Sequence, residues 1–242
     1  MTIRIAPLLA LLVGCGTTGS LREPAEVGLR DAEVGFRDDF DTGEPGRWGR
    51  VIDVRDGKLF PTSFGDYNPA IREDRVGENW ELSVGLGWVK GAEGRSVISV
   101  MVVGPSHRGS NRIPQVRWQA GFDYWNRLWR VRVNGPERDH TLAEGGFADI
   151  GYSPGGVTVF RLSHAYGVLS LYANDSLIYR DNVEGVLPDE VGGENATEGR
   201  YVALFFTADE PTDEAVYFDW VEIRRSTVDP CPPHIKCERI GG

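Results

Sequence analysis

Cysteine and histidine are scarce in this chain, which has three cysteines and four histidines among its 242 residues. The histidines are His107, His140, His164 and His234. Their scattered positions match no spacing of metal ligands, so the sequence gives no indication of a histidine-based metal centre. The glycine cluster at residues 191–194 does not follow a strand and open a helix, as a phosphate-binding loop must.

Basic charge and long apolar runs are lacking as well. Lysine and arginine together number 26 against 36 aspartate and glutamate residues, which gives a formal net charge of -10. No basic patch stands out, and this argues against nucleic acid as a partner. The apolar stretch at residues 5–13 is too short to span a bilayer, which needs about 20 apolar residues.

The N-terminus has the layout of a secretory signal peptide. A short start with the single positive charge of Arg4 leads into an apolar stretch that ends in Leu12-Val13-Gly14-Cys15. This tetrapeptide resembles the lipobox of bacterial lipoproteins, in which the cysteine is acylated and becomes the new N-terminus. The resemblance implies a signal peptide over residues 1–14 and a palmitate-type lipid anchor on Cys15. An ordinary signal peptide is the alternative.

The resemblance also implies a location. The protein would be extracytoplasmic in the cell envelope, with the lipid bilayer as a partner through acylated Cys15. Gly16 stands where an aspartate would act in sorting, which favours the outer membrane if the cell has one. The polar residues 15–34 then form a flexible tether between lipid and domain.

The other two cysteines, Cys231 and Cys237, lie close together in a C-terminal tail over residues 227–242. In an exported protein such a pair is expected to form a disulfide that closes a small loop. A metal site would need more ligands than His234 supplies in this segment. No thiol is then left for catalysis.

The region between tether and tail is dominated by patterns of β-strands. Residues 80–89 alternate between large apolar residues and Glu81, Ser83, Gly85 and Gly87, which predicts a half-buried strand. Residues 96–103 form a nearly continuous apolar run, which indicates a central strand. Further strands are predicted at residues 115–122, 127–134, 157–164, 168–173, 177–179, 201–207 and 215–224.

These strands predict an all-β domain over residues 35–226. The 31 glycines suit many short strands joined by tight turns, and no convincing amphipathic helix is present. Alternation on most strands favours a two-sheet antiparallel β-sandwich with one polar face on each sheet. Four tryptophans alternate in step with the apolar residues of their strands and are predicted to lie in the core: Trp80, Trp88, Trp118 and Trp129.

Three local patterns resemble the concanavalin A-like jelly roll of lectins and glucanases. The opening has the form DDF…W at Asp38-Asp39-Phe40 and Trp48. Residues 157–175 resemble a hairpin of laminin-G-like domains, with Asp175 where glycine is usual. Residues 216–223 resemble the closing strand of family-16 glycoside hydrolases. The resemblance implies a jelly roll, with glycans or oligosaccharides as the expected partners.

The catalytic motif of the family-16 enzymes, E-x-D-x-x-E, does not occur in this chain. Retaining glycosidases need two carboxylates about 5–5.5 Å apart. The acidic cluster at residues 209–214 contains a proline between two apolar runs and is predicted to be a solvated loop. We therefore expect a noncatalytic carbohydrate-binding domain. A hydrolase similar to the 3-keto-disaccharide hydrolases and a structural or adhesion module of the envelope are the alternatives.

Candidate ligand-binding residues fall on two neighbouring predicted strands and the loop between them. Alternate polar residues of these strands face the same side of the sheet, where they can form hydrogen bonds with the hydroxyls of a sugar. An aromatic residue of the loop can stack on the C–H face of the sugar ring. The predicted site consists of Arg117, Gln119, Asp123, Tyr124, Trp125, Arg130 and Arg132. The alternative is two ordinary solvent-facing strands whose Arg and Asp side chains pair across them.

The resemblance also implies a candidate calcium site. In the family-16 enzymes the aspartate of the closing strand often helps to bind a structural calcium, and Asp219 stands at that position. Asp39 and Asp41 of the N-terminal segment would add oxygen ligands, which calcium requires. The alternative is that Asp219 is hydrogen-bonded to a loop backbone.

Overall fold

The structure, a computed structural model, describes residues 33–41, 53–60, 70–77, 79–89, 97–104, 117–134, 139–183, 199–208 and 215–225. Regular structure in these residues is almost entirely β-strand, with a short 3-10 helix, η2 (Phe147–Ile150). Over the same residues, no helix has the length and apolar character needed to cross a membrane. The predicted all-β fold class is confirmed.

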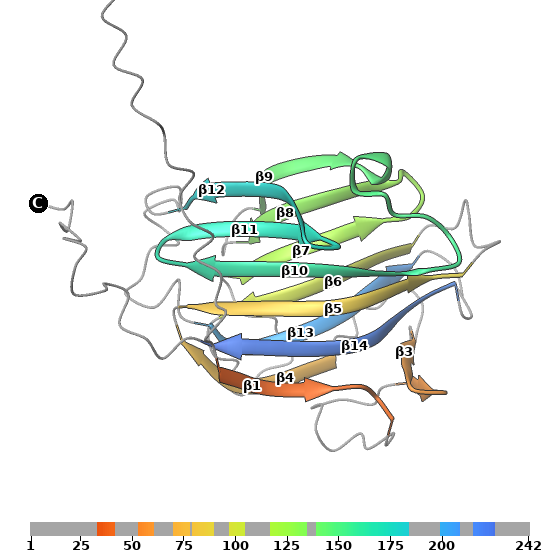
Figure 1. Cartoon of the computed structure of the whole chain (residues 1–242), viewed down its shortest axis with the longest axis horizontal. Coiled ribbons are helices and arrows are strands. Elements are labelled where there is room, and N and C mark those ends of the chain that lie inside the picture. Colours follow the sequence, from red (N-terminus) through yellow and green to blue (C-terminus); the bar gives the residue numbers. More distant parts are fainter. Residues whose placement is uncertain are drawn as a thin grey trace, which may run out of the picture.

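The larger sheet has eight strands in the order β12-β11-β10-β5-β14-β3-β2, and β1 also pairs with β14 (Figure 1). The bounds of its strands are β1 (Glu33–Asp38), β2 (Asp53–Arg55), β3 (Lys58–Phe60), β5 (Trp80–Trp88), β10 (Val157–Ala165), β11 (Val168–Ala173), β12 (Ser176–Asn182) and β14 (Val216–Arg225). Each of its strand pairs is antiparallel.

The smaller sheet has six strands in the order β4-β13-β6-β7-β8-β9 and lies behind the larger sheet in Figure 1. The bounds of its strands are β4 (Ala70–Gly77), β6 (Val97–Gly104), β7 (Arg117–Asp123), β8 (Leu128–Asn134), β9 (Asp139–Gly146) and β13 (Gly199–Ala208). Its pairs are antiparallel as well. The apolar strand β6 lies between β13 and β7, which confirms the prediction of a central position.

The core lies between the two sheets and is built from alternate residues of their strands. On β7, for example, Trp118, Ala120 and Phe122 point into the core while Gln119 and Gly121 point outward. The four tryptophans predicted to be buried all belong to this core. Period-two alternation therefore identified the inner faces of β5, β7 and β8 correctly.

Strand β5 differs from its prediction, because all nine of its residues are buried. It lies between β10 and β14 in the middle of the sheet. Rings from β14 cover its outward-facing glycines: Trp220 lies against Gly85 and Tyr217 against Gly87. The alternating pattern placed one face of β5 in solvent, but neighbouring side chains remove that face from water.

Five strands carried too little pattern to be predicted, and β1, with the sequence EVGFRD, is the first of them. β2 and β3 have three residues each. The sequence of β4 is AIREDRVG and that of β9 is DHTLAEGG, and neither alternates clearly. The hairpin between β11 and β12 was predicted, and Asn174 and Asp175 take positive φ angles of 46° and 65°, as a tight hairpin turn requires.

Candidate functional site

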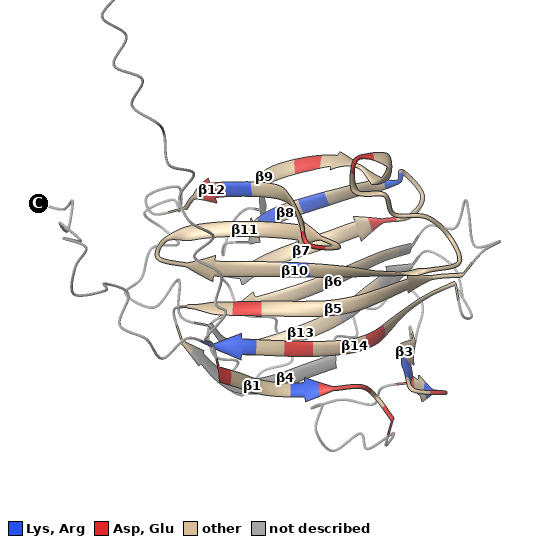
Figure 2. Cartoon of the chain, viewed as in Figure 1, with Lys and Arg blue, Asp and Glu red and all other residues tan. Residues whose placement is uncertain are grey.

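The predicted ligand-binding residues of β7 and β8 lie on the outer face of the six-stranded sheet. Gln119 pairs directly with Arg132, and Gly121 pairs with Arg130. Figure 2 shows the basic segments of β8 beside the acidic end of β7 and an acidic segment of β9. Arg117 begins β7 opposite Asn134, and its side chain lies outside the described residues. The structure thus brings the strand residues of the predicted site together.

A row of outward-facing residues crosses five strands at the level of Gln119. The pairings run from Ala203 on β13 to Val102 on β6, then to Gln119, Arg132 and Thr141. Val102 and Ala203 are buried and form a small apolar cluster with Val100. The row therefore passes from buried apolar side chains on β13 and β6 to an amide, a guanidinium and a hydroxyl on β7, β8 and β9.

Two groups in this row have hydrogen-bonding capacity that the described residues leave unused. Gln119 is 5% exposed, and its Oε1 atom has no hydrogen-bond partner there. Arg132 is half-buried, and its buried Nε atom also lacks a partner within the same residues. Buried polar groups are normally hydrogen-bonded because leaving them unpaired costs free energy. A ligand with donors and acceptors would satisfy both groups.

Arg130, by contrast, is held by two carboxylates. Its Nε donates to Oε2 of Glu144 at 3.0 Å, and its Nη1 lies 3.6 Å from Oδ2 of Asp123. Glu144 is the cross-strand neighbour of Arg130 on β9. This part of the predicted site matches the alternative that the sequence left open, in which charged side chains pair across neighbouring strands.

The loop between β7 and β8 is a tight turn that Asp123 fixes. The backbone N–H of Asn126 donates to Oδ1 of Asp123 at 3.0 Å, and its side-chain amide donates to Oδ2 at 2.8 Å. Arg127 closes the turn with a positive φ of 54°. Carboxylate-to-backbone bonds of this kind are a common way to stabilise a turn.

The turn points its two aromatic residues in opposite directions. Trp125 is 59% exposed, whereas Tyr124 is 1% exposed and belongs to the core. The Tyr124 ring packs edge-on against Trp88 and Phe147, with centroid distances of 5.5 and 5.7 Å. Tyr124 was predicted as a sugar-stacking residue, and the structure corrects this because its ring is enclosed. Trp125 remains available for that role.

The hydroxyl of Tyr124 accepts a hydrogen bond from that of Tyr152 at 3.2 Å. Burial raises the pKa of both phenols above the usual value of 10.0. Both rings therefore stay neutral at physiological pH and contribute to packing. Sequence reasoning missed this aromatic cluster, because Tyr152 lies in a loop that no periodic pattern marks.

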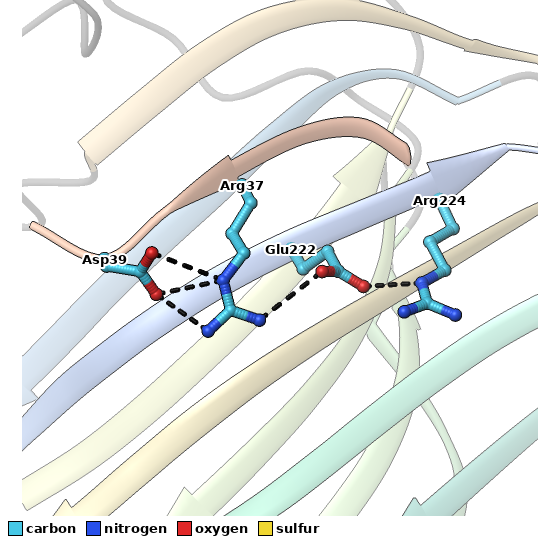
Figure 3. Close-up of polar contacts among 4 residues, drawn as sticks. All are labelled: Arg37, Asp39, Glu222 and Arg224. Carbon is cyan, nitrogen blue, oxygen red and sulfur yellow. Dashed lines mark hydrogen bonds and ion pairs between the residues drawn. The ribbon is translucent and has the colours of Figure 1, made fainter. Parts of the chain in front are cut away.

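A chain of charged side chains crosses the outer face of the eight-stranded sheet, and sequence reasoning missed it. Arg37 on β1 donates to Oδ1 of Asp39 at 2.8 Å and to Oε2 of Glu222 at 3.5 Å. Glu222 also accepts a hydrogen bond from Nε of Arg224 (Figure 3). The hydrogen bond to Asp39 is the main cause that raises the pKa of Arg37. These pairs tie β1 to β14.

The same face continues across β5 and β10. Nε of Arg161 lies 3.7 Å from Oε2 of Glu81, and its guanidinium lies over the Tyr172 ring at 4.2 Å from the centroid. Burial raises the pKa of Glu81, and the nearby Arg161 and Arg224 oppose this rise. The sequence shows the charged residues Glu81 and Arg161, but which of them pair depends on the order of the strands in the sheet.

Aromatic rings occupy the other half of this face. A Cβ atom added to Gly85 would lie 2.5 Å from Nε1 of Trp220, and one added to Gly87 would meet the Tyr217 ring. Cations cover the rings: Arg37 lies 4.8 Å from the Trp220 centroid, and Lys58 lies 4.6 Å from that of Tyr217. Each ring is thus held between a glycine and a cation, an arrangement that stabilises the sheet.

The calcium site predicted at Asp39, Asp41 and Asp219 stays a prediction. The Asp39 carboxylate already accepts hydrogen bonds from Nε and Nη2 of Arg37 at 3.0 and 2.8 Å. Asp219 is half-buried at a bulge of β14, and Asp41 lies beside Gly57. Within the described parts of the chain, no group of three or more His, Cys, Asp or Glu residues is arranged to hold a metal ion. Calcium takes six to eight oxygen ligands, so a site here would need oxygens beyond these three carboxylates.

The predicted lipidation site Cys15 and the predicted disulfide between Cys231 and Cys237 lie outside the described residues. The same holds for Trp48 of the opening motif. These features stay predictions.

Comparisons with solved structures identify the fold. The chain is similar to an endo-1,3-beta-glucanase (laminarinase) catalytic domain from Thermotoga petrophila, with a TM-score of 0.56 and 11% identity over 82% of this chain and 99% of that one. The laminarinase from Rhodothermus marinus gives 0.54 and 12%, covering 80% and 97% of the two chains. The CBM2 module of an evolved Dit protein from Lactobacillus casei phage J-1 gives 0.55 and 10%, covering 82% and 97%.

These likenesses show a concanavalin A-like jelly roll, as the sequence motifs predicted. In these comparisons the sequence matches no protein family and no curated protein. The fold is therefore shown by tertiary structure at an identity of about one residue in ten.

Proposed function

We propose that this chain is a lipoprotein of the cell envelope whose β-sandwich binds a glycan without cleaving it. The binding surface is the outer face of β7 and β8, with Trp125 at the turn. Acylated Cys15 attaches the protein to the membrane, and the residues up to 32 connect the lipid to the sandwich. The tether predicted to end at residue 34 is therefore two residues shorter, because Glu33 and Val34 belong to β1. The outer membrane is the expected site if the cell has one.

The observation that carries this proposal is the Gln119–Arg132 pair. These cross-strand neighbours hold buried hydrogen-bonding atoms that have no partner in the described part of the chain. Sugar hydroxyls donate to an amide oxygen and accept from a guanidinium, so a glycan suits both groups.

The fold supports a glycan as the ligand, because similar structures include an endo-1,3-beta-glucanase and a CBM2 module. Binding is favoured over hydrolysis by the state of the carboxylates on this face. Asp123 and Glu144 are both paired with Arg130, and an acid–base pair for glycoside cleavage requires carboxylates that address the scissile bond.

Trp125 and the Gln119–Arg132 pair are separated along β7. Trp125 lies in the turn beyond the end of β7, and the four residue steps from Gln119 to Asp123, at about 3.3 Å each, alone span roughly 13 Å. A ligand that contacts both must therefore be an extended oligosaccharide, and affinity is expected to rise with its length.

The test is a glycan array with the full-length chain in detergent, followed by calorimetry on the glycans that bind. Gln119→Met removes the amide and keeps the size of the side chain, so we expect binding to weaken about tenfold or more. The free energy of unfolding should stay the same or rise, because an unpaired buried polar group is replaced by an apolar one. Trp125→Ala should also weaken binding, with Leu177→Ala on β12 as the matched control of another exposed apolar side chain.

The proposal fails if no glycan binds at millimolar concentration and Trp125→Ala changes nothing. A second readout follows the bound glycan for new reducing ends. Their appearance would show that the domain is a hydrolase and would refute the noncatalytic part of the proposal.

A further inference from the structure

Resting on the proposed glycan-binding function, we infer that the Gln119–Arg132 site selects acidic sugars, in which an anionic carboxylate or sulfate group binds Arg132. The sugar hydroxyl next to that group binds Gln119. The inference names the chemical class of the ligand, which neither the fold nor the similar structures indicate.

Arg132 stands apart from the other half-buried arginines whose side chains the structure describes. Arg130, Arg161, Arg224 and Arg225 each have a carboxylate oxygen within 4 Å of a guanidinium nitrogen, at 3.0, 3.7, 2.5 and 3.7 Å. Arg132 forms no ion pair with the described residues, and its Nε atom is buried without a hydrogen-bond partner among them. The charge is therefore partly removed from water, and no carboxylate of the described residues compensates it.

An uncompensated half-buried charge is costly, and proteins normally pair such groups. The guanidinium is a planar fork of donors that matches a carboxylate or sulfate and is weakly hydrated, so it gains from an anionic ligand. Gln119 is directly opposite and supplies an acceptor oxygen that has no donor in the described residues. A sugar with an acid group beside a hydroxyl satisfies both atoms at once.

The neighbouring charges determine where the acid group binds. Arg130 lies two residues before Arg132 on β8, about 7 Å away along the strand. Asp123 and Glu144 already compensate Arg130 and place two carboxylates at that end of the site. An anionic group is repelled from that end and attracted to Arg132, so uncharged parts of the ligand extend toward the β7–β8 turn.

The overall charge of the protein argues that this selection is local. With a formal net charge of -10, the chain as a whole repels an anionic glycan. Preference for an acidic sugar must then come from a specific contact, and replacing that one arginine should remove it.

The experiment measures the affinity of the full-length chain, in detergent, for matched pairs of oligosaccharides. The probes are oligogalacturonate and oligoglucuronate, each beside its carboxyl-reduced form, and a sulfated galactan oligosaccharide beside its desulfated form. We expect at least one acidic probe to bind roughly tenfold or more tightly than its neutral counterpart. The uronate and sulfate arms distinguish the two sources of the anionic group.

Arg132→Gln should abolish this preference and leave the weaker affinity for the neutral probe. Arg132→Lys should keep part of the preference, because lysine retains the positive charge but lacks the paired N–H donors of the guanidinium group. Arg180→Gln on β12, an exposed arginine of the other sheet, is the control and should change nothing. Far-ultraviolet circular dichroism and urea unfolding establish that each variant is folded.

Equal affinity for the acidic and neutral members of every pair would overturn the inference, as would a preference that survives Arg132→Gln. In either case glycan binding itself would stand. If neither these probes nor any glycan on the array bound, the proposed function would fail together with the inference.

Discussion

Substitution of Gly85 on β5 by alanine tests how tightly the side chains pack on the outer face of the eight-stranded sheet. A Cβ atom there would lie 2.5 Å from Nε1 of Trp220, too close for contact without a shift of the ring. We expect Gly85→Ala to lower the free energy of unfolding by about 1–3 kcal/mol, since the displaced ring also leaves Arg37. Urea unfolding followed by tryptophan fluorescence measures the change.

Gly121 on β7 is the matched control for this substitution. A Cβ atom at Gly121 would meet its nearest side-chain atoms, on Val100 and Ile98, at 3.8 and 3.9 Å, which is ordinary contact. Gly121→Ala should raise the free energy of unfolding by about 0.5–1 kcal/mol, because glycine weakens a strand. Equal losses for the two variants would contradict the assigned position of the Trp220 ring.

Glu81 on β5 makes stability depend on pH. Burial raises its pKa above the ordinary value of 4.5, so the folded protein holds this proton more tightly than the unfolded chain does. Unfolding then releases a proton, and the contribution of Glu81 to stability falls as pH rises from about 4.5 through the folded pKa.

Glu81→Gln cannot ionise and lacks this dependence. We expect the difference in free energy of unfolding between the variant and the wild type to shift in favour of the variant as pH rises from about 4 to about 7. Urea unfolding of both proteins across this range measures the difference. A difference that is constant with pH would show that Glu81 has no raised pKa.

At the scale of the element, the β7–β8 turn couples the core to the proposed binding surface. Tyr124 packs inside against Trp88 and Phe147, and Trp125 lies outside. We expect Tyr124→Ala to cost about 3–5 kcal/mol of unfolding free energy, as other large aromatic truncations in cores do. Trp125→Ala should change stability by less than about 0.5 kcal/mol.

Thermal or urea unfolding of the two variants checks this contrast. Comparable destabilisation by both would mean that the Trp125 side chain packs against the protein. In that case Trp125 would not be available to stack on a sugar.

The sequence patterns of β7 and β8 predicted which strand residues face outward, but they did not predict the directions of the two aromatic side chains in the turn. The alternation of β7 and β8 identified Gln119 and Arg132 as outward-facing, because the direction of side chains repeats every two residues. No periodic rule applies within a four-residue turn, so the sequence named both Tyr124 and Trp125 as candidates. Burial of Tyr124 depends on Phe147 and Tyr152, which lie more than 20 residues further along the chain.

At the scale of the whole molecule, the first and last described strands pair with each other. Glu33 of β1 lies opposite Arg225 of β14, so the N-terminal end of β1 and the C-terminal end of β14 lie side by side in the eight-stranded sheet. The proposed binding face belongs to the other sheet. A lipid anchor on Cys15 would therefore be joined to the sandwich on the sheet that does not bind the glycan.

The anchor itself is tested by Cys15→Ser in the producing cells. We expect the wild-type chain in the membrane fraction and the variant in the soluble extracytoplasmic fraction, since the lipid chains supply the attachment. Glycan binding should be the same in both. If the variant stayed with the membrane through a high-salt wash, acylation of Cys15 would not be the means of attachment.

The sequence alone determined the fold class and the inner faces of β5, β7 and β8. Alternation with period two follows from local backbone geometry and needs no knowledge of the partner strands. It also determined the outward direction of Gln119 and Arg132. Only the tertiary structure decided that Arg130 is paired with carboxylates while Arg132 has no ion pair with the described residues. It also decided that aromatic rings cover the glycines of β5 and that Tyr124 is enclosed. These properties depend on strand order and register, which join residues far apart in the chain, and no local pattern encodes them.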